Sequence, residues 1–465
     1  MTTVQFPDGF RWGVATAAFQ IEGATDVDGR TDSIWDVMCR RPGAVLNGDT
    51  GDVACDHYRR MPSDVAMMQD LGVGTYRFST SWCRVRPDGG AVNERGVGFY
   101  SRLVDTLLEN GITPWLTLYH WDLPQTLEDA GGWANRDTAY RFVDYALTVH
   151  EALGDRVPTW TTLNEPWCSS LLSYGAGHHA PGRTEPRAAV ASVHHLLLAH
   201  GLASEALRSA GVGAGRGDEL GITLNLSLFS APDPVRPQDE DVVRRLDGLQ
   251  NRVFTDPVLT GEYPEDVRAD LAHLGFDELV RDGDLASIGT PIDVLGVNYY
   301  TTAQVRDGSG QYPSPWVGAD EEGAARVETL DRGAPRTAMG WDVTPDGLRE
   351  LLVRLDHDYD RIGAGTSLVV TENGAAYDDP DPVDGRVHDE DRRAYLEAHL
   401  RACHEAVEAG VPLTGYLAWS LMDNFEWAFG YDRRFGLVHV DYETQVRTPK
   451  DSARWYADVM RDNGF

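Results

Sequence analysis

The chain of 465 residues is long enough for two or three average domains or for one large α/β barrel. Its 73 acidic and 41 basic side chains give a formal net charge of -32, and such a field repels nucleic acid and anionic lipid surfaces. The five cysteines form no CxxC pair, and no apolar run reaches the roughly 18 residues that span a bilayer, so we expect no zinc site, disulfide framework or membrane segment.

Short apolar strands alternate with longer amphipathic helices along the whole chain. The expected strands, rich in β-branched and aromatic residues, are 11–19, 75–82, 113–120, 157–165, 221–229, 292–300, 367–374 and 413–421. Capping signals favour helices that begin near Ser63, Thr344 and Asp389. Eight strands, seven of them leading to a helix, predict one α/β domain over 1–465, a single (β/α)8 TIM barrel.

The chain exceeds the about 250 residues of a typical barrel, and we expect the surplus in long loops. The candidate loops all follow strands rather than precede them, and they are 20–62, 166–187, 301–343 and 422–448. Loops in that position form the active-site face of such a barrel. The architecture by itself does not give a function, which has to come from the residues at that face.

Amides, carboxylates and indoles stand where the predicted strands end. In chain order they are Gln20, Glu22, Arg77, His120, Trp121, Asn164, Glu165, Asn298, Tyr300, Glu372, Trp419, Glu426 and Trp427. Because the carboxyl ends of the strands meet at one face, these side chains should converge on one mouth. Such a set suits a neutral polyhydroxylated ligand, whose hydroxyls bind amides and carboxylates and whose C–H faces pack on aromatic rings.

Two glutamates occupy matching positions, Glu165 in "TTLNE" and Glu372 in "VVTEN". On strands four and seven they would face each other across the mouth, and two carboxyl groups across a sugar-sized cleft are the equipment for glycosidic bond hydrolysis. Arg77 and Tyr300 would keep the second carboxylate anionic by charge and hydrogen bonding. Burial and the anionic neighbour would raise the pKa of the first.

Longer motifs carry a resemblance that covers nearly the whole chain. They are "FRWGVATAAFQIEGA", "YHWDLPQ", "TLNEP", "GVNYY", "VVTENG" and "LMDNFEWAFGYDRRFGLVHVD". With these motifs in this order, the sequence resembles the family 1 glycoside hydrolases, retaining β-glycosidases of the β-glucosidase type. The resemblance implies hydrolysis by double displacement, with Glu165 as general acid/base and Glu372 as nucleophile. The two carboxyl groups should then lie about 5–5.5 Å apart.

The resemblance also assigns the substrate-binding residues. It implies that the sugar hydroxyls are held by Gln20, His120, Asn164, Glu426 and Trp427, with Trp121 beside His120. Trp419 would form the floor under the sugar. Asn298 would orient the region of the 2-hydroxyl and Tyr300 the nucleophile, with Arg77 beside it. Trp167 and Trp341, on the loops after strands four and six, would line the aglycone side.

The implied substrate is a small-molecule β-glycoside or oligosaccharide, such as a cello-oligosaccharide or an aryl or alkyl β-glucoside, and no cofactor or metal is implied. Galactosides and fucosides are expected side substrates, because galactose and glucose differ at one epimeric hydroxyl and the same side chains can often bind either sugar. The oligomeric state is open, either monomer or homo-oligomer. The first residues, "MTTVQFPDGF", show no signal peptide, so we expect a cytoplasmic protein without membrane or nucleic-acid partners.

Other interpretations stay in view for some residues. His194, His195 and His200 in "HHLLLAH" invite a metal hypothesis, but no HExxH motif accompanies them, which favours helix packing. A carbohydrate-binding protein on an inactive barrel would lack one of the two glutamates. A metal-dependent hydrolase would need paired histidines on the first strand, where there are none. Three tryptophans, Trp82, Trp115 and Trp160, are expected in the core, and His57 is expected to be structural.

Overall fold

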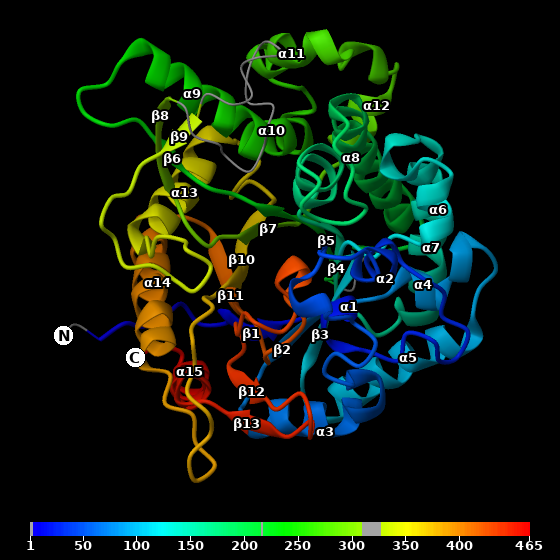
Figure 1. Cartoon of the computed structure of the whole chain (residues 1–465), viewed down its shortest axis with the longest axis vertical. Helices are drawn as coiled ribbons and strands as arrows, with labels where there is room; N and C mark the ends of the chain where they lie inside the picture. Colours follow the sequence, from blue (N-terminus) through cyan, green and yellow to red (C-terminus); the bar gives the residue numbers. More distant parts are fainter. Residues whose placement is uncertain (1–2, 215–216, 309–326) are drawn as a thin grey trace.

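A computed structural model describes residues 3–214, 217–308 and 327–465. Eight parallel strands close into a barrel in the order β1-β11-β10-β7-β5-β4-β3-β2. The strands are β1 (Arg11–Ala15), β2 (Thr75–Ser79), β3 (Thr113–Tyr119), β4 (Thr159–Asn164), β5 (Glu219–Asn225), β7 (Val294–Asn298), β10 (Ser367–Asn373) and β11 (Leu413–Trp419). Figure 1 shows them at the centre with helices around them. The predicted (β/α)8 barrel is confirmed.

Amphipathic helices surround the barrel (Figure 1). The longer ones are α3 (His57–Asp70), α5 (Glu94–Glu109), α7 (Asp137–Leu153), α8 (Pro186–Ser209), α9 (Pro237–Asp247), α10 (Val253–Thr260), α13 (Pro345–Asp358), α14 (Glu390–Glu408) and α15 (Asp451–Asp462). In α5 the buried residues Phe99, Leu103 and Leu107 recur every four positions, which places them on one face of a helix with 3.6 residues per turn.

Shorter elements lie in the connections. The helices are α1 (Ala18–Ile21), α2 (Ile34–Cys39), α4 (Trp82–Val85), α6 (Gln125–Asp129), α11 (Glu265–Leu271) and α12 (Asp284–Ile288). Two small sheets are formed by β12 (Val438–Val440) with β13 (Arg447–Pro449), and by β6 (Phe229–Ser230), β8 (Ala303–Asp307) and β9 (Val327–Thr329). The 309–326 part of the predicted loop 301–343 lies outside the described residues.

The barrel interior changes from apolar to polar along the strands. Trp115, Val294, Val369 and Leu417 form an apolar cluster of their own, separate from the main core. Nearer the strand ends stand buried polar residues, of which Asn164 and Asn298 are the last residues of β4 and β7. The apolar layer therefore closes the barrel below, and the polar groups gather at the face that the strand-following loops build.

The expected strands are found in order, but several end earlier than predicted. The first ends at Ala15 rather than Phe19, so Gln20 lies on α1 instead of at a strand end. The chain turns there because the N–H of Ala18 binds the Ser79 hydroxyl at 2.7 Å instead of continuing the ladder. Likewise the second strand stops at Ser79, and the fifth at Asn225.

The predicted helix starts are right in two cases of three. Thr344 and Asp389 are the residues directly before α13 and α14, as expected. The third helix does not begin at Ser63 but six residues earlier, at His57, because Pro62 is accommodated within α3. The three expected core tryptophans, Trp82, Trp115 and Trp160, are buried as predicted.

Candidate active site

Glu372 lies near the end of β10 with both carboxylate oxygens held by donors. Arg77 Nη1 donates to Oε1 at 2.6 Å, and the Tyr300 hydroxyl donates to Oε2 at 2.8 Å. Burial raises the pKa of Glu372, while the Arg77 charge and these hydrogen bonds oppose that rise. Glu372 is therefore the carboxylate of the mouth that is directly bonded to a cation.

Glu165 follows the last residue of β4 and is held without a cation. Asn298 Nδ2 donates to Oε1 at 2.6 Å, and the Cys168 thiol donates to Oε2 at 3.1 Å. Burial and the charge of Glu372 raise the pKa of Glu165 to about 8. At neutral pH the Glu165 side chain is thus mainly a carboxylic acid that can give a proton away.

A chain of hydrogen bonds connects the two glutamates through Asn164. Arg77 Nη2 donates to Asn164 Oδ1 at 2.6 Å, and Asn298 Nδ2 reaches the same oxygen at 3.1 Å. Asn164 Nδ2 in turn lies 3.0 Å from His120 Nε2. Burial and the Arg77 charge lower the pKa of His120, so the ring is neutral. The strand ends of β2, β4 and β7 are fixed to one another by these bonds.

The backbone at the mouth is unusual in three places. Glu165, Trp121 and Trp427 have φ values of 49°, 78° and 48°, in the left-handed region that non-glycine residues rarely adopt. The strand register also shifts between Thr161 and Asn164 in β4 and between Val370 and Glu372 in β10. Irregular ladders and left-handed residues re-aim side chains and are common beside active sites.

An aromatic wall borders these groups. His120 stacks with Trp419 at 5.8 Å between ring centroids, and Trp121 lies 4.6 Å from Trp427. Trp121 Nε1 also donates to the carbonyl of Asn164 at 2.9 Å. Imidazole Nδ1 of His120 is buried and has no hydrogen-bond partner among the described protein atoms, so it is available to a ligand.

Gln20 and Glu426 meet beside this aromatic wall, next to Trp427. Gln20 Nε2 donates to Asn424 Oδ1 at 3.0 Å and to the Phe425 carbonyl at 2.9 Å, and it lies 3.4 Å from Glu426 Oε2. Gln20 Oε1 is buried and, in the described part of the chain, meets no donor. Burial and the charges of Glu372 and Glu165 raise the pKa of Glu426 to about 8.

The predicted aglycone residues lie on two sides. Trp341 packs against Tyr300 at 5.3 Å and Phe435 at 6.2 Å, in a small cluster with Trp419 that is separate from the main core. Trp167, two residues beyond Glu165, is buried within the main core cluster and is 8% exposed. Trp341 therefore borders the mouth beside the donor of Glu372, whereas Trp167 leaves only an edge accessible.

The histidines of the metal hypothesis pack inside the protein. His194 contacts the Tyr263 hydroxyl at 3.0 Å and Asp284 at 2.9 Å, and His200 contacts the Thr162 hydroxyl at 2.7 Å. Among the residues that the structure describes, no three His, Cys, Asp or Glu side chains are grouped to hold a metal ion. His57, bonded to Asp64 at 2.8 Å within α3, is structural as expected.

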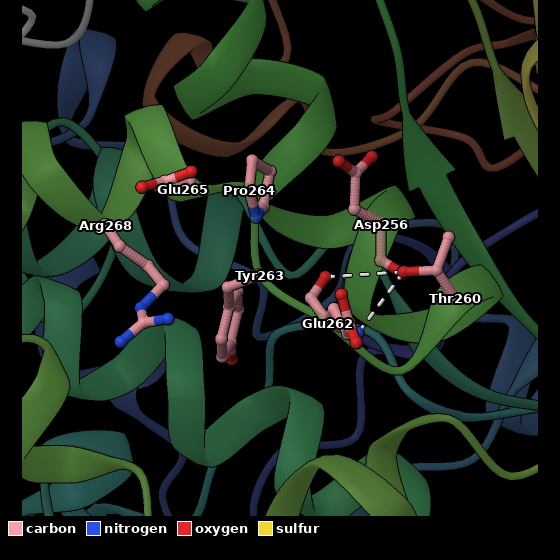
Figure 2. Close-up of a pocket in the computed structure, with 7 residues that line it drawn as sticks. All are labelled: Asp256, Thr260, Glu262, Tyr263, Pro264, Glu265 and Arg268. Atoms are coloured by element: carbon pink, nitrogen blue, oxygen red, sulfur yellow. Dashed lines mark hydrogen bonds between the residues drawn. The ribbon is translucent and has the colours of Figure 1, made fainter.

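A pocket of about 440 Å³ lies elsewhere, around the turn between α10 and α11. Figure 2 shows its lining: Asp256, Thr260, Glu262, Tyr263, Pro264, Glu265 and Arg268. The Thr260 hydroxyl bonds to the backbone of Asp256 and Glu262, which shapes the turn. None of the site residues predicted from the sequence lines this pocket.

The described helices include none that is long and apolar enough to cross a bilayer.

Sequence reasoning missed several residues that support the mouth. The ring centroid of Trp35 lies 4.6 Å from that of Trp427. The ring centroid of His179 lies 5.1 Å from that of Trp121. Phe435 packs on Trp341, and no strand end signals any of these three. Their only sequence signal is their place in the loops 20–62, 166–187 and 422–448, which were expected to build this face.

Comparison with known proteins gives matches over the full length. The sequence model of glycosyl hydrolase family 1 matches residues 2–465. The chain is 52% identical to thermostable beta-glucosidase B of Thermobispora bispora, covering 99% of this chain and 92% of that protein. It is 50% identical to a bifunctional beta-D-glucosidase/beta-D-fucosidase of Bifidobacterium breve, covering 99% of both.

Solved structures are similar over the whole chain as well. A psychrophilic beta-glucosidase from Micrococcus antarcticus superposes with a TM-score of 0.93 at 51% identity, covering 100% of both chains. A family 1 b-glucosidase from Thermotoga maritima superposes with a TM-score of 0.91 at 43% identity, again over 100% of both chains. The likeness therefore covers the whole length of the chain.

Proposed function

Since the chain belongs to glycosyl hydrolase family 1, we propose that it is a retaining β-glucosidase whose acid/base is Glu165 and whose nucleophile is Glu372. Its substrates are terminal β-D-glucosyl residues of cello-oligosaccharides or of aryl and alkyl β-glucosides. The whole of 1–465 acts as one catalytic domain. These roles need one carboxyl group that stays protonated and one that stays ionised at the same pH.

The observation that carries the assignment is the unequal bonding of the two glutamates. Glu372 accepts from a guanidinium and a phenol hydroxyl, which stabilise its anion. Glu165 accepts from a neutral amide and a thiol, and burial beside another carboxylate raises its pKa to about 8. The anion is suited to attack the anomeric carbon, and the acid is suited to protonate the leaving oxygen.

The reaction is then a double displacement. In the first step Glu372 bonds to the anomeric carbon while Glu165 protonates the departing glycosidic oxygen. In the second step water attacks the anomeric carbon, Glu165 takes the proton from that water, and the bond to Glu372 breaks. Two inversions give net retention. A carboxyl separation of about 5–5.5 Å remains a prediction of this mechanism.

The sugar would be held by the polar atoms that lack protein partners and by the aromatic wall. Gln20 Oε1 and His120 Nδ1 are such atoms and would bind hydroxyl groups. The remaining assignments place Asn164, Glu426 and Trp427 on the hydroxyls, Trp121 beside His120, Trp419 under the ring, Asn298 near the 2-hydroxyl, Tyr300 on the nucleophile, and Trp167 and Trp341 on the aglycone side.

Unphosphorylated sugars fit this mouth better than sugar phosphates. Glu426 adds a third buried carboxyl group to the mouth, where a phosphate would need a cation. Arg433 pairs with Asp432, and Arg434 donates to Asp423 at 2.7 Å, so both cations near this loop already have carboxylate partners. Fucosides, which lack the 6-hydroxyl, are proposed side substrates because the Bifidobacterium breve relative is a bifunctional glucosidase and fucosidase. Galactosides are also proposed, because galactose differs from glucose only in the configuration of one hydroxyl group.

A cytoplasmic location is also part of the proposal. All five cysteines are free thiols, which fits a reducing compartment. The small-molecule glycoside is the partner that the site requires, and no cofactor enters the mechanism.

The test is hydrolysis of a panel of p-nitrophenyl β-glycosides by the wild type and by Glu372→Gly, with and without azide. We expect the glucoside to be preferred, Glu372→Gly to be inactive alone, and azide to restore cleavage with an α-glucosyl azide as product. A β-configured azide product, or a fully active Glu372→Gly variant, would remove Glu372 from the nucleophile role.

A further inference from the structure

Protein donors occupy both oxygens of the Glu165 side chain. Asn298 Nδ2 lies 2.6 Å from Oε1, and Cys168 Sγ lies 3.1 Å from Oε2. Cys168 begins the helical segment Cys168–Gly175, three residues beyond Glu165, so the thiol is carried by the backbone that follows the glutamate. When Glu165 is protonated, the new hydrogen must therefore share an oxygen with one of these two donors.

The orientation of Asn298 is forced by its neighbours. The Arg77 guanidinium has only donors, so the Asn164 atom that it contacts must be the oxygen. The Asn298 atom that faces this oxygen must then be the nitrogen, and Asn298 Oδ1 accepts from the Thr371 hydroxyl at 2.8 Å. An amide nitrogen carries two hydrogens and accepts none. A proton on Glu165 Oε1 would meet an N–H group at 2.6 Å, which excludes it from that oxygen.

The thiol at the other oxygen can give way. Asn225 Nδ2 approaches Cys168 Sγ at 3.8 Å and acts as a donor, so the S–H of Cys168 is left for Glu165 Oε2. Burial and the charge of Glu165 raise the pKa of Cys168, so it remains a thiol. An S–H group is a weak donor that rotates about the Cβ–Sγ bond, and it can withdraw when Oε2 gains a hydrogen.

We propose that Cys168 is a positioning residue for proton transfer: because Asn298 closes Oε1, the thiol keeps Oε2 as the oxygen that delivers and recovers the proton. The inference rests on the proposed acid/base role of Glu165. When the glycosidic C–O bond breaks, its electron pair stays on the leaving oxygen, which takes the hydrogen from Oε2 as Glu372 bonds to the anomeric carbon. The S–H of Cys168 then donates to the Oε2 anion. In the second step a water proton returns to Oε2 and the thiol withdraws.

Several charged or titratable groups face Glu165 from other elements, and they stay constant when Cys168 alone is changed. They are Glu372 on β10, Arg77 on β2, Tyr300 after β7 and Glu426 after β11, and His120 after β3 contacts the adjacent Asn164. A change in the pH profile among Cys168 variants therefore reports the group at Oε2.

The experiment compares the pH dependence of kcat/KM in wild type, Cys168→Ser and Cys168→Ala, with an alkyl β-glucoside that needs acid assistance. The alkaline limb reflects ionisation of the acid. A hydroxyl donates more strongly than a thiol and stabilises the carboxylate, so Cys168→Ser should move this limb to lower pH than wild type. Cys168→Ala removes the donor and should move it to higher pH, each by roughly half a pH unit or more. Cys168→Val, which fills the site with an apolar side chain larger than that of cysteine, should follow the alanine variant and serves if the smaller alanine destabilises the fold.

The control is Cys403→Ser, which changes an equally buried thiol on α14 and should leave the profile unchanged. Equal limbs in all Cys168 variants, or a shift in the same direction for serine and alanine, would overturn the inference. Glu165→Gln separates this failure from a failure of the proposed function. If that variant keeps the wild-type alkaline limb, Glu165 is not the acid at all. If it loses the limb while the Cys168 variants do not differ, only the role of Cys168 falls.

Discussion

The protein holds two groups of buried carboxylates, one at the mouth and one in the loops that follow β10 and β11, and their charges are balanced in opposite ways. At the mouth, Glu165, Glu372 and Glu426 share one bonded cation, Arg77. Burial raises the pKa of all three, and their mutual repulsion adds to the rise for Glu165 and Glu426. The three carboxyl groups at the mouth therefore do not all ionise at the same pH.

The second group is charge-balanced. Three aspartates, Asp379, Asp389 and Asp423, meet three cations, Arg392, Arg434 and Lys450. Lys450 Nζ donates to Asp379 at 2.6 Å and to Asp423 at 2.7 Å, and Arg392 donates to both oxygens of Asp379 at 2.8 Å. Although burial alone would raise it, the pKa of Asp423 is lowered because the charges of Lys450, Arg434 and Arg392 outweigh that effect.

The difference shows what each group does. The balanced network keeps Asp423 ionised and fixes the loop that begins at this residue, whose next residues contact Gln20 and include Glu426. In a group without enough cations, one carboxyl group stays protonated beside an ionised carboxylate. General acid catalysis needs such a protonated group. Lys450 is the single lysine of the sequence, and it is completely buried between two aspartates.

The largest effect is expected at the mouth, from Glu165→Ala. Loss of the general acid should slow cleavage of alkyl β-glucosides by roughly 10²–10⁴-fold, because their leaving groups need protonation. Activated aryl glucosides should be slowed far less in the first step, because their leaving groups depart as anions. Comparing kcat/KM for the two substrate classes measures this difference. Equal slowing of both would mean that Glu165 does not protonate the leaving group.

The next effect is expected in the balanced network, from Lys450→Met. The variant leaves Asp379 and Asp423 with less cationic charge, and breaking a buried ion pair by removing one partner costs about 3–5 kcal/mol of folding free energy. Urea unfolding of variant and wild type gives the change. Arg461→Met, which breaks an exposed ion pair on α15, is the matched control and should leave the transition where it is. A Lys450→Met transition at the wild-type position would show that the network does not hold the fold.

The smallest effect is the pH dependence of stability in Glu165→Gln. The folded pKa of Glu165 is raised to about 8, above the about 4.3 of an unfolded glutamate. Between these values the folded state keeps a proton that the unfolded state releases, so the stability from this group is lost as pH rises. Glutamine cannot titrate, and the free energy of unfolding of Glu165→Gln relative to wild type should therefore increase from pH 5 to pH 8, by up to roughly 4 kcal/mol, which urea unfolding at each pH measures.

Asp423→Asn tests a carboxyl group whose pKa is shifted in the opposite direction, downward rather than upward. The folded pKa of Asp423 is lowered, so its carboxylate contributes stability above the unfolded pKa and loses it only as pH falls. This variant should be less stable than wild type throughout pH 5 to 8. If Glu165→Gln and Asp423→Asn respond to pH in the same direction, the contrast between the two groups is wrong.

The strands and most site residues could be predicted because local patterns determine them. Glu165 and Glu372 close β-branched runs of matching sequence, and a barrel brings such strand ends to one face. The sequence predicts Gln20 at a strand end because "GVATAAF" before it is almost entirely apolar. The hydrogen bond that turns the chain at Ala18 comes from Ser79, more than sixty residues away, and a local pattern does not contain it.

Other features depend on contacts between distant segments and leave no sequence signal. The sequence shows that Lys450 is the single lysine, but its two aspartate partners come from two other loops. The Cys168 bond to Glu165 depends on the left-handed backbone at Glu165, since "NEPWC" read alone does not show where the thiol points. Trp35 and His179 reach Trp427 and Trp121 only after the loops fold over the mouth.

The central claim is that Glu165 holds the shared proton because it is buried and because Glu372 is ionised beside it. A ¹³C NMR titration of carboxyl-labelled glutamates, assigned with Glu165→Gln and Glu372→Gln, measures it directly. We expect the Glu165 signal of the wild type to titrate near pH 8, and its pKa to fall toward the usual glutamate range in Glu372→Gln, where the neighbouring charge is gone. A Glu165 signal that titrates in the usual range in both proteins, or a Glu372 that stays protonated at pH 7 while Glu165 is ionised, would contradict the account.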